Sequence, residues 1–327
     1  MPDEPLPIDR HLGRFLRLHA DLTAARRWWE STQLFPHAAT LQLTAPGNPR
    51  DRATEAAESA RGVARSARIW DVTWQLRWLF GSLLAAHGRP ATELRPELER
   101  LREDYADRSL KRRGALAHLS MLVFWCLDDD PELRELRLDR MAALHRALGR
   151  SRSWITGADD LAGCALVVSL IGREDDAVLR FETAYEALHA AGMPRGNGLQ
   201  LAALVLAALP IDPREGAHRV ADIAAGLVHK RVRIVPSDYD ELVPFAPFAV
   251  TSQVVVHQIL ADRDAATVLV TGWQPQLRFQ LGCGLAASAL LDEHDLEPEM
   301  RRAVVAATHT AVALSAVKTA IGQGATA

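Results

Sequence analysis

The chain has 327 residues, of which 48% are apolar and 24% are charged, and its formal net charge is -3. This length exceeds the roughly 250–300 residues that one hydrophobic core supports, so we expect either two domains or one elongated array. The apolar content excludes a chain that is mainly disordered. With 38 basic against 41 acidic residues, no basic excess indicates nucleic acid as the main partner.

Almost the whole chain shows helical spacing, in which apolar residues recur three and four positions apart. Glycine and proline fall mostly between these periodic segments, where they end one helix before the next begins. Residues 228–235 come nearest to the alternation of a β-strand, but they can equally end a helix. The pattern predicts an all-α fold of about fourteen helices with little or no β-sheet.

Residues 1–69 are expected to form an N-terminal helical segment. The first ten residues, MPDEPLPIDR, have neither the basic region nor the apolar region of a signal peptide. The three cysteines, Cys126, Cys164 and Cys283, lie far apart in apolar runs, so we expect buried thiols rather than disulfides. Together these features predict a cytoplasmic protein.

A stripe of tryptophans follows, at a spacing of four residues: Trp70, Trp74 and Trp78, with Arg77 beside it and Trp28 and Trp29 upstream. Side chains four residues apart lie on one helix face, so the stripe fits core packing between helices. The alternative is an aromatic groove for a small ligand or a peptide.

Four segments share one pattern, an apolar helix, a short charged or proline-containing turn and an amphipathic helix: residues 76–105, 116–149, 161–192 and 199–231. One such unit cannot bury its apolar faces alone, so we expect the units to stack as helical hairpins, as in an α-solenoid. Residues 70–235 would form this array of repeats. Residues 236–327 would add C-terminal hairpins and a capping helix to one continuous elongated domain.

An acidic run, Asp128, Asp129, Asp130 and Glu132, lies at the turn of the second segment. The spacing of Asp128, Asp129 and Glu132 resembles the aspartate-rich motif of class I terpene synthases, which implies Mg²⁺ ions that bind a diphosphate. Carboxylates suit Mg²⁺ because it is a hard cation with oxygen ligands. Against this, the second metal motif is missing and only 6% of the residues are aromatic. A solvated turn with acids at the start of the next helix explains the run equally well.

Polar residues mark the places where successive first helices begin, and we call this set the polar rim: Thr156, Asp159, Asp160, Arg195, Asn197, Gln200, Asp238 and Asp240. Equivalent positions in stacked hairpins lie side by side at one end of the stack. The spacing also fits capping boxes that join Thr156 to Asp159, Asn197 to Gln200 and Ser237 to Asp240. The rim is therefore either a set of helix caps or, in addition, a shared binding cleft that neighbouring helix N-termini make attractive to anions.

The stretch 156–209 resembles a bacterial family known as domain of unknown function 4003. The resemblance lies in Thr156-Gly157-x-Asp159-Asp160, in Gly172-Arg173-Glu174 with Tyr185, and in Gly192-x-x-Arg195-Gly196-Asn197-x-Leu199-Gln200. The chain departs from the family pattern at Met193, where an aromatic residue is expected, and in its N-terminal part, which is rich in tryptophan and arginine. The resemblance implies a helical fold and no particular activity.

The last helix, expected to run from residue 300 to about residue 321, is apolar on most faces. Its charge-poor stretch is shorter than the ~20 residues that cross a bilayer, so no membrane span is predicted. We expect this last helix to close the hydrophobic core or, alternatively, to form a homodimer contact.

The sequence therefore favours a cytoplasmic binding or scaffold protein that uses the polar rim to bind an unknown protein or a small molecule. The alternative is an enzyme with a helical cavity, in which Asp159 and Asp160 act as acid and base or the Asp128 cluster binds Mg²⁺. No nucleic acid partner and no cofactor are predicted, since no zinc, phosphate-binding or nucleophile motif occurs. An enzyme needs several groups converging around an enclosed pocket, whereas a scaffold needs only an open surface.

Overall fold

The protein is helical throughout the part that the structure, a computed structural model, describes: residues 7–28, 30–67, 72–152, 157–172, 174–269 and 275–322. These residues form sixteen α-helices and three short 3₁₀ helices, and they contain no strand. The all-α prediction is confirmed. Two helices of only four residues, α4 (Val72–Gln75) and α13 (Tyr239–Leu242), account for the difference from the expected number.

The chain divides into two compact units. The first unit comprises Met1–Leu94, Gln253–Leu296 and Ser315–Ala327, and the second comprises Arg95–Ser252 and Glu297–Leu314. The division of the chain at residues 69 and 235 that the sequence suggests stays a prediction.

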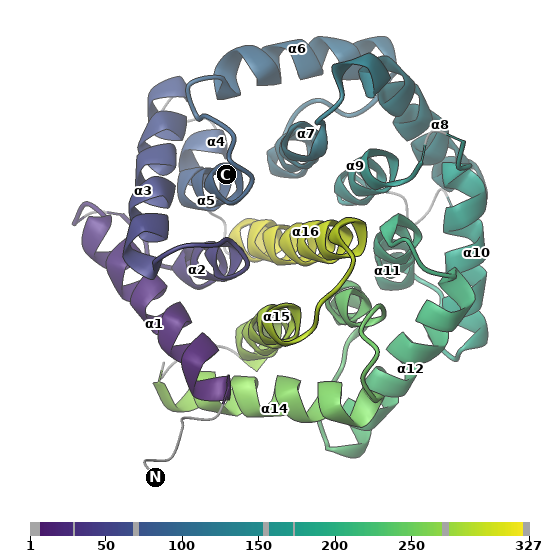
Figure 1. The fold of residues 1–327 in the computed structure, drawn as a ribbon. Coiled ribbons are helices and arrows are strands. Elements are labelled where there is room, and N and C mark those ends of the chain that lie inside the picture. The colour runs from purple at the N-terminus through teal and green to yellow at the C-terminus, as the bar shows by residue number, and fades with distance from the viewer. Residues whose placement is uncertain are drawn as a thin grey trace. The chain divides into compact units, whose positions relative to one another are not determined.

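The first unit has an inner and an outer layer of helices (Figure 1). The outer helices are α1 (Pro7–Ala25), α3 (Pro49–Ser66) and α14 (Ser252–Leu269), and the inner ones are α2 (Phe35–Leu43), α5 (Arg77–Ala86) and α15 (Pro275–Glu293). Helices α3 and α5 approach closely because Gly81 has no side chain, and a Cβ there would lie 2.4 Å from the backbone N of Ala60. Phe15, Phe35 and Trp78 belong to the apolar core of this unit.

The second unit is a row of helical hairpins, each with an inner helix followed by an outer one (Figure 1). The inner helices are α7 (Ala115–Leu127), α9 (Asp160–Leu170) and α11 (Asn197–Ala208). The outer ones are α6 (Leu94–Asp107), α8 (Arg134–Arg152), α10 (Ala177–Ala190) and α12 (Pro213–His229). The short helices η2 (Pro236–Asp238), α13 and η3 (Val243–Phe245) follow α12, and η1 (Pro131–Leu133) precedes α8.

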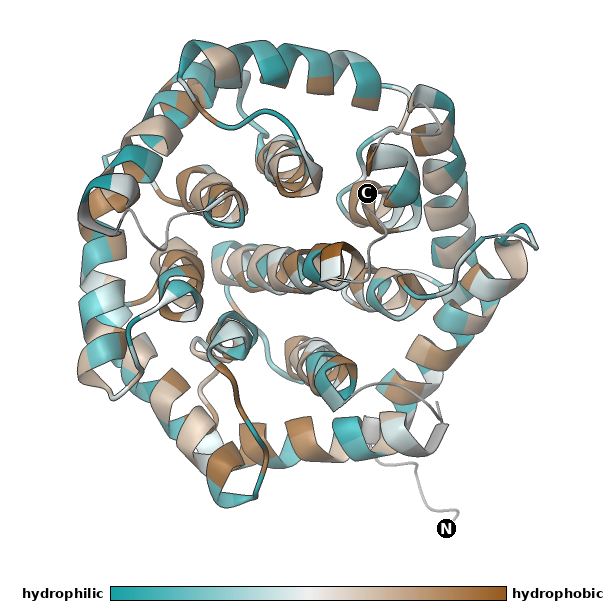
Figure 2. Ribbon diagram, turned by 180° about the vertical axis from the view of Figure 1, so that it is seen from behind, coloured by the Kyte–Doolittle hydropathy of each residue, from teal (hydrophilic) through white to brown (hydrophobic). Residues whose placement is uncertain are grey.

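Three of these hairpins, α7–α8, α9–α10 and α11–α12, coincide with three of the four segments expected from the sequence. Every residue of α11 from Gly198 to Ala208 is buried, whereas the outer helix α12 buries only one stripe. The outer helices accordingly alternate hydrophilic and hydrophobic residues in Figure 2. Each fully buried large apolar side chain contributes about 1.5–3 kcal/mol, so the inner helices supply most of the core.

Three outer helices of the second unit, α6, α10 and α12, end in similar caps. After α6, the N–H groups of Ser109 and Leu110 donate to the carbonyls of Ala106 and Tyr105, at 3.0 and 2.8 Å. After α12, Arg231 and Val232 make the same pair of bonds. These are Schellman caps, which place one residue in the left-handed region that glycine prefers. Gly192 fills that position after α10, but Ser109 (φ 58°) and Arg231 (φ 62°) fill it after α6 and α12.

The last helix, α16 (Pro298–Gly322), contributes residues to both units. Among the described residues it is the one helix long and apolar enough to cross a membrane, and 78% of its apolar window is buried inside the protein. Such burial is typical of a core helix in a soluble protein. The homodimer contact expected through this helix stays a prediction.

Candidate functional site

The polar rim lies in the second unit, where the inner helices begin. Helices α7, α9 and α11 point the same way, because an outer helix returns the chain after α7 and again after α9. Asn197 at the start of α11 donates from Nδ2 to Oδ2 of Asp159, just before α9, at 2.6 Å. Both side chains are half-buried. The structure thus brings these two helix starts together.

The start of α11 also lies against η2. A Cβ on Gly198 would lie 1.9 Å from the carbonyl oxygen of Pro236, so only glycine allows this contact. Asp238 and Asp240, which follow Pro236, are almost fully buried. The rim residues of three consecutive segments therefore neighbour one another, as their repeat positions predict.

Two of the expected capping pairs, Asn197 with Gln200 and Ser237 with Asp240, are wrong. At the start of α9, Oδ2 of Asp160 accepts the backbone N–H of Gly157, at 2.7 Å. Oδ2 of Asp238, not Asp240, accepts the N–H of Val235, at 3.0 Å. Thr156 lies outside the described residues. Two buried acids of the rim therefore bind backbone at helix starts, which stabilises the local fold.

The remaining rim residues differ in exposure and pairing. Gln200 is fully buried, and neither atom of its amide group has a hydrogen-bond partner among the described residues. Arg195, in contrast, is exposed and pairs with Glu186 at 3.3 Å. Asp160 also affects Cys164, one turn further along α9. Burial raises the pKa of the Cys164 thiol well above its usual value, and the negative charge of Asp160 raises this pKa further. Cys164 is thus kept as a protonated thiol.

At this same end many of the residues that reach solvent are cations. We call them the cationic loops, and they join outer helices to the following inner helices: Lys111, Arg112, Arg113, Arg195, Lys230, Arg231 and Arg233, all exposed. Apart from Arg195, none of these side chains makes a hydrogen bond or an ion pair within the described part of the chain. The rim thus has acids inside and basic groups outside.

Helix stability does not explain where several of these cations lie. Lys111, Arg112 and Arg113 immediately precede α7, and Arg195 immediately precedes α11. The start of a helix carries partial positive charge, so it disfavours a cation and favours an anion. Cations and helix starts together make this end attractive to negatively charged groups.

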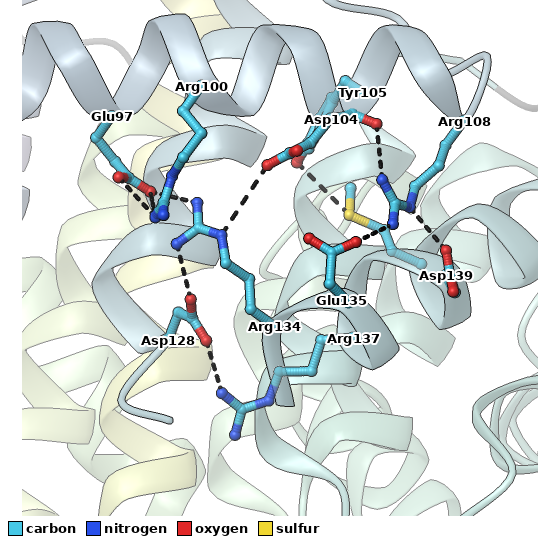
Figure 3. A network of polar contacts seen from close by, with 11 residues as sticks. Glu97, Arg100, Asp104, Tyr105, Arg108, Asp128, Arg134, Glu135, Arg137 and Asp139 are labelled. Carbon is cyan, nitrogen blue, oxygen red and sulfur yellow. Dashed lines mark hydrogen bonds and ion pairs between the residues drawn. The ribbon is translucent and has the colours of Figure 1, made fainter. Parts of the chain in front are cut away.

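The acidic run at the opposite end of α7 forms ion pairs (Figure 3). The two carboxylate oxygens of Asp128 accept from Arg134 at 3.0 Å and from Arg137 at 2.8 Å. Arg134 also binds Glu97, so the pairs tie α8 to α6. Arg108 at the end of α6 bonds to Glu135 and Asp139 of α8.

Asp129 and Glu132 complete the candidate metal set. Asp129 pairs with Arg302 of α16 at 2.7 Å. Burial raises the pKa of the Asp129 carboxyl, but the bond and charge of Arg302 outweigh it and lower the pKa overall. Glu132 is exposed, and the described residues contain no group of three or more histidine, cysteine or acidic side chains that could hold a metal ion. Mg²⁺ binding here stays a prediction, and it would require Asp128 and Asp129 to leave their arginines.

The tryptophans of the stripe and the upstream Trp28 differ in how far they are buried. Trp78 is buried and packs edge-on against Phe35, with ring centroids 4.8 Å apart, as core packing predicts. Trp74 is half-buried, and the guanidinium of Arg77 lies 4.4 Å from the centroid of its ring. Trp28 is 86% exposed. Trp29 and Trp70 lie outside the described residues.

Comparison with protein-family models, with curated proteins and with solved structures finds no match to this chain. The resemblance to domain of unknown function 4003 therefore stays a prediction. The evidence for function comes from the geometry of the chain itself.

Proposed function

We infer that this protein is a binding or scaffold protein and that an acidic protein partner docks on its cationic loops. The observation that carries the proposal is the set of exposed, mostly unpaired cations around the starts of the inner helices. Basic groups of this kind attract an acidic surface and raise its association rate.

The conformation of Arg231 supports the proposal independently. Its φ of 62° lies in the left-handed region. A non-glycine residue pays about 1–2 kcal/mol there, and glycine occupies the equivalent position after α10 at Gly192. The strained position thus carries an exposed positive charge at the end of the unit where the cationic loops lie.

The rim acids favour binding over catalysis. Asp160 accepts a backbone N–H, and Asp159 accepts the amide of Asn197. An acid–base pair instead needs carboxyl groups directed at a substrate in an enclosed pocket. The enzyme alternative, with Asp159 and Asp160 or with the Asp128 cluster and Mg²⁺, has less support from the geometry.

We also propose that the protein works in the cytoplasm. Cys126, Cys164 and Cys283 are all buried, and none of them forms a disulfide. Cysteines outside disulfides are typical of proteins in reducing compartments.

The test is the affinity of the protein for a fluorescent peptide of consecutive glutamates, measured by anisotropy. We expect the variant Arg112→Glu/Arg113→Glu to bind about tenfold more weakly than the wild type, because each reversal replaces attraction with repulsion. The matched control is Arg17→Glu/Arg50→Glu, which has the same change in net charge at exposed positions of the first unit.

Equal losses in the two variants would show that only net charge matters and would contradict the proposal. A DNA duplex of similar charge provides a second arm. Tighter binding of the duplex than of the peptide would replace the acidic protein with nucleic acid as the partner class.

A further inference from the structure

A cavity of about 280 Å³ opens in the first unit, between α3 and the segment that holds α4 and α5. Its floor consists of Glu30, Trp74, Arg77 and Trp78. Three further arginines surround it, Arg27, Arg61 and Arg65. The cavity is separate from the polar rim and the cationic loops, which belong to the second unit.

The floor is a fixed and electrically neutral group. One carboxylate oxygen of Glu30 pairs with Arg77 at 2.8 Å, and the other accepts the indole N–H of Trp78 at 3.1 Å. Arg77 also donates to the carbonyl of Trp74 at 3.0 Å and stacks on its ring. Both charged side chains of the pair are about nine-tenths buried.

The electrostatics of Glu30 agree with a permanent ion pair. Burial raises the pKa of its carboxyl, but the hydrogen bonds from Arg77, from the backbone of Arg27 and from Trp78 outweigh burial, and the pKa falls overall. Glu30 is therefore ionised at neutral pH and cancels the charge of Arg77. Arg61 and Arg65, which have no ion-pair partner among the described residues, give the lining of the cavity an excess of positive charge.

The geometry of α3 directs two of these charges at the same space. Arg61 and Arg65 are four residues apart, so they lie on one face of the helix. Both are exposed, and neither makes an ion pair or hydrogen bond with any described residue. Ala60 and Ala64 line the same cavity, and their small side chains leave space beside the two arginines.

The charged groups of the lining that have no ion-pair partner among the described residues, Arg61 and Arg65, are both guanidinium groups, which narrows the class of ligand. A guanidinium presents parallel N–H donors that match the two oxygens of a carboxylate or a phosphate. The positive charge of the lining would repel a cation, and a neutral ligand would leave this charge without a counterion. A volume of about 280 Å³ corresponds to roughly nine water molecules, at ~30 Å³ each, so the occupant is small.

We propose that this cavity binds a small multivalent oxyanion, a metabolite of about ten non-hydrogen atoms that carries phosphate or several carboxylates, with Arg61 and Arg65 as its ligands. The indole rings of Trp74 and Trp78 offer the rest of such a ligand an apolar wall. Their position also makes tryptophan fluorescence a direct readout of binding.

Isothermal titration calorimetry of the full chain tests the proposal with four probes: citrate, 3-phosphoglycerate, acetate and glycerol. We expect saturable binding of citrate, of 3-phosphoglycerate or of both, accompanied by a change in tryptophan fluorescence, and no saturable binding of acetate or glycerol. The stronger of the first two identifies the source of the oxyanion as polycarboxylate or phosphate ester.

Two variants locate the site. Arg61→Ala/Arg65→Ala is expected to weaken binding about thirtyfold, because it removes two charge-assisted contacts. Arg61→Lys/Arg65→Lys keeps the charge but loses the forked donors, and we expect it to recover only part of the affinity. Arg17→Ala/Arg50→Ala loses the same net charge elsewhere in the unit and should bind like the wild type.

Two outcomes would overturn the proposal. The first is the absence of saturable binding of both multivalent probes by the folded wild-type protein. The second is equal weakening by the Arg61→Ala/Arg65→Ala variant and by the Arg17→Ala/Arg50→Ala control. Neither outcome bears on the glutamate-peptide experiment, because the cationic loops remain intact in all of these variants.

Discussion

The acid with the most unusual environment is Asp262, on helix α14 in the first unit. Its side chain is fully buried, and its one hydrogen bond among the described residues comes from Gln258 at 2.9 Å. Burial raises the pKa of its carboxyl to about 7, against the Gln258 bond, and the charge of Glu293 adds to the rise. Asp262 is therefore protonated in the folded state under mildly acidic conditions.

This raised pKa makes the free energy of unfolding depend on pH. The folded state holds the proton more tightly than the unfolded chain, whose carboxyl titrates near the ordinary value of 3.8. The associated stabilisation is complete below pH ~4 and is lost as the pH rises to ~7. Asp262→Asn has no proton to lose, so its stability relative to the wild type should increase by about 2–3 kcal/mol between pH 5 and pH 8.

Urea denaturation of both proteins across this pH range measures the effect. Asp264→Asn is the matched control, because Asp264 is exposed on the same helix, and its difference from the wild type should stay flat. His37 has the opposite pH dependence, since burial lowers its pKa to about 4. Its contribution is present in every variant and cancels in the comparison. A flat difference for Asp262→Asn would contradict the assigned titration.

Between elements, the closest approach in the second unit is the contact of α11 with η2. Gly198→Ala would place a methyl group 1.9 Å from the Pro236 carbonyl oxygen, so the backbone must move. Overpacking of this kind costs about 3 kcal/mol when no flexible side chain can yield.

The control for this substitution is Gly13→Ala, at a helical glycine of α1 with nothing within 4 Å of the added Cβ. It should stabilise the protein by about 0.5–1 kcal/mol, because alanine is the better helix former. Thermal and urea denaturation give both values. Similar, small effects of the two substitutions would mean that α11 and η2 are not packed as described.

The elements themselves were largely predictable from the sequence. The run from Ala115 to Leu127 is almost uniformly apolar, and the breaks that contain Gly114, Gly192 and Gly196 coincide with helix ends. The partners of individual polar side chains were not predictable. The cap at Asp238 differs by two residues from the expected one at Asp240, because helix-start geometry, rather than spacing alone, decides which carboxylate reaches the backbone.

Contacts between segments that are distant in the sequence were even harder to predict. Nothing in the sequence around Asp129 indicates that its partner is Arg302, which lies 173 residues away on α16. The cavity in the first unit could not be predicted for the same reason. Only the fold places Trp74 and Glu30 beside Arg61 and Arg65. The one available signal was an arginine pair at a spacing of four, flanked by alanines.

At the scale of the whole molecule, the net charge conceals how the charges are distributed. The chain is slightly acidic, with a formal charge of -3, yet seven exposed basic residues lie in the loops before the inner helices. Exposed acids such as Asp175 and Asp176 lie at the other end of the same hairpins. An approaching ligand responds to the nearest charges, because salt screens those beyond ~8–10 Å.

This distribution gives a prediction with a definite sign for the binding of the glutamate peptide. If net charge governed association, the acidic peptide would be repelled, and added salt would strengthen binding by screening that repulsion. If the cationic loops govern association, added salt must weaken binding.

We expect the affinity to fall about tenfold between 50 and 300 mM NaCl, mainly through a slower association rate. Stopped-flow fluorescence separates the two rate constants, and in Arg112→Glu/Arg113→Glu the salt dependence should be nearly flat. An affinity that rises with salt would exclude the cationic loops as the docking surface.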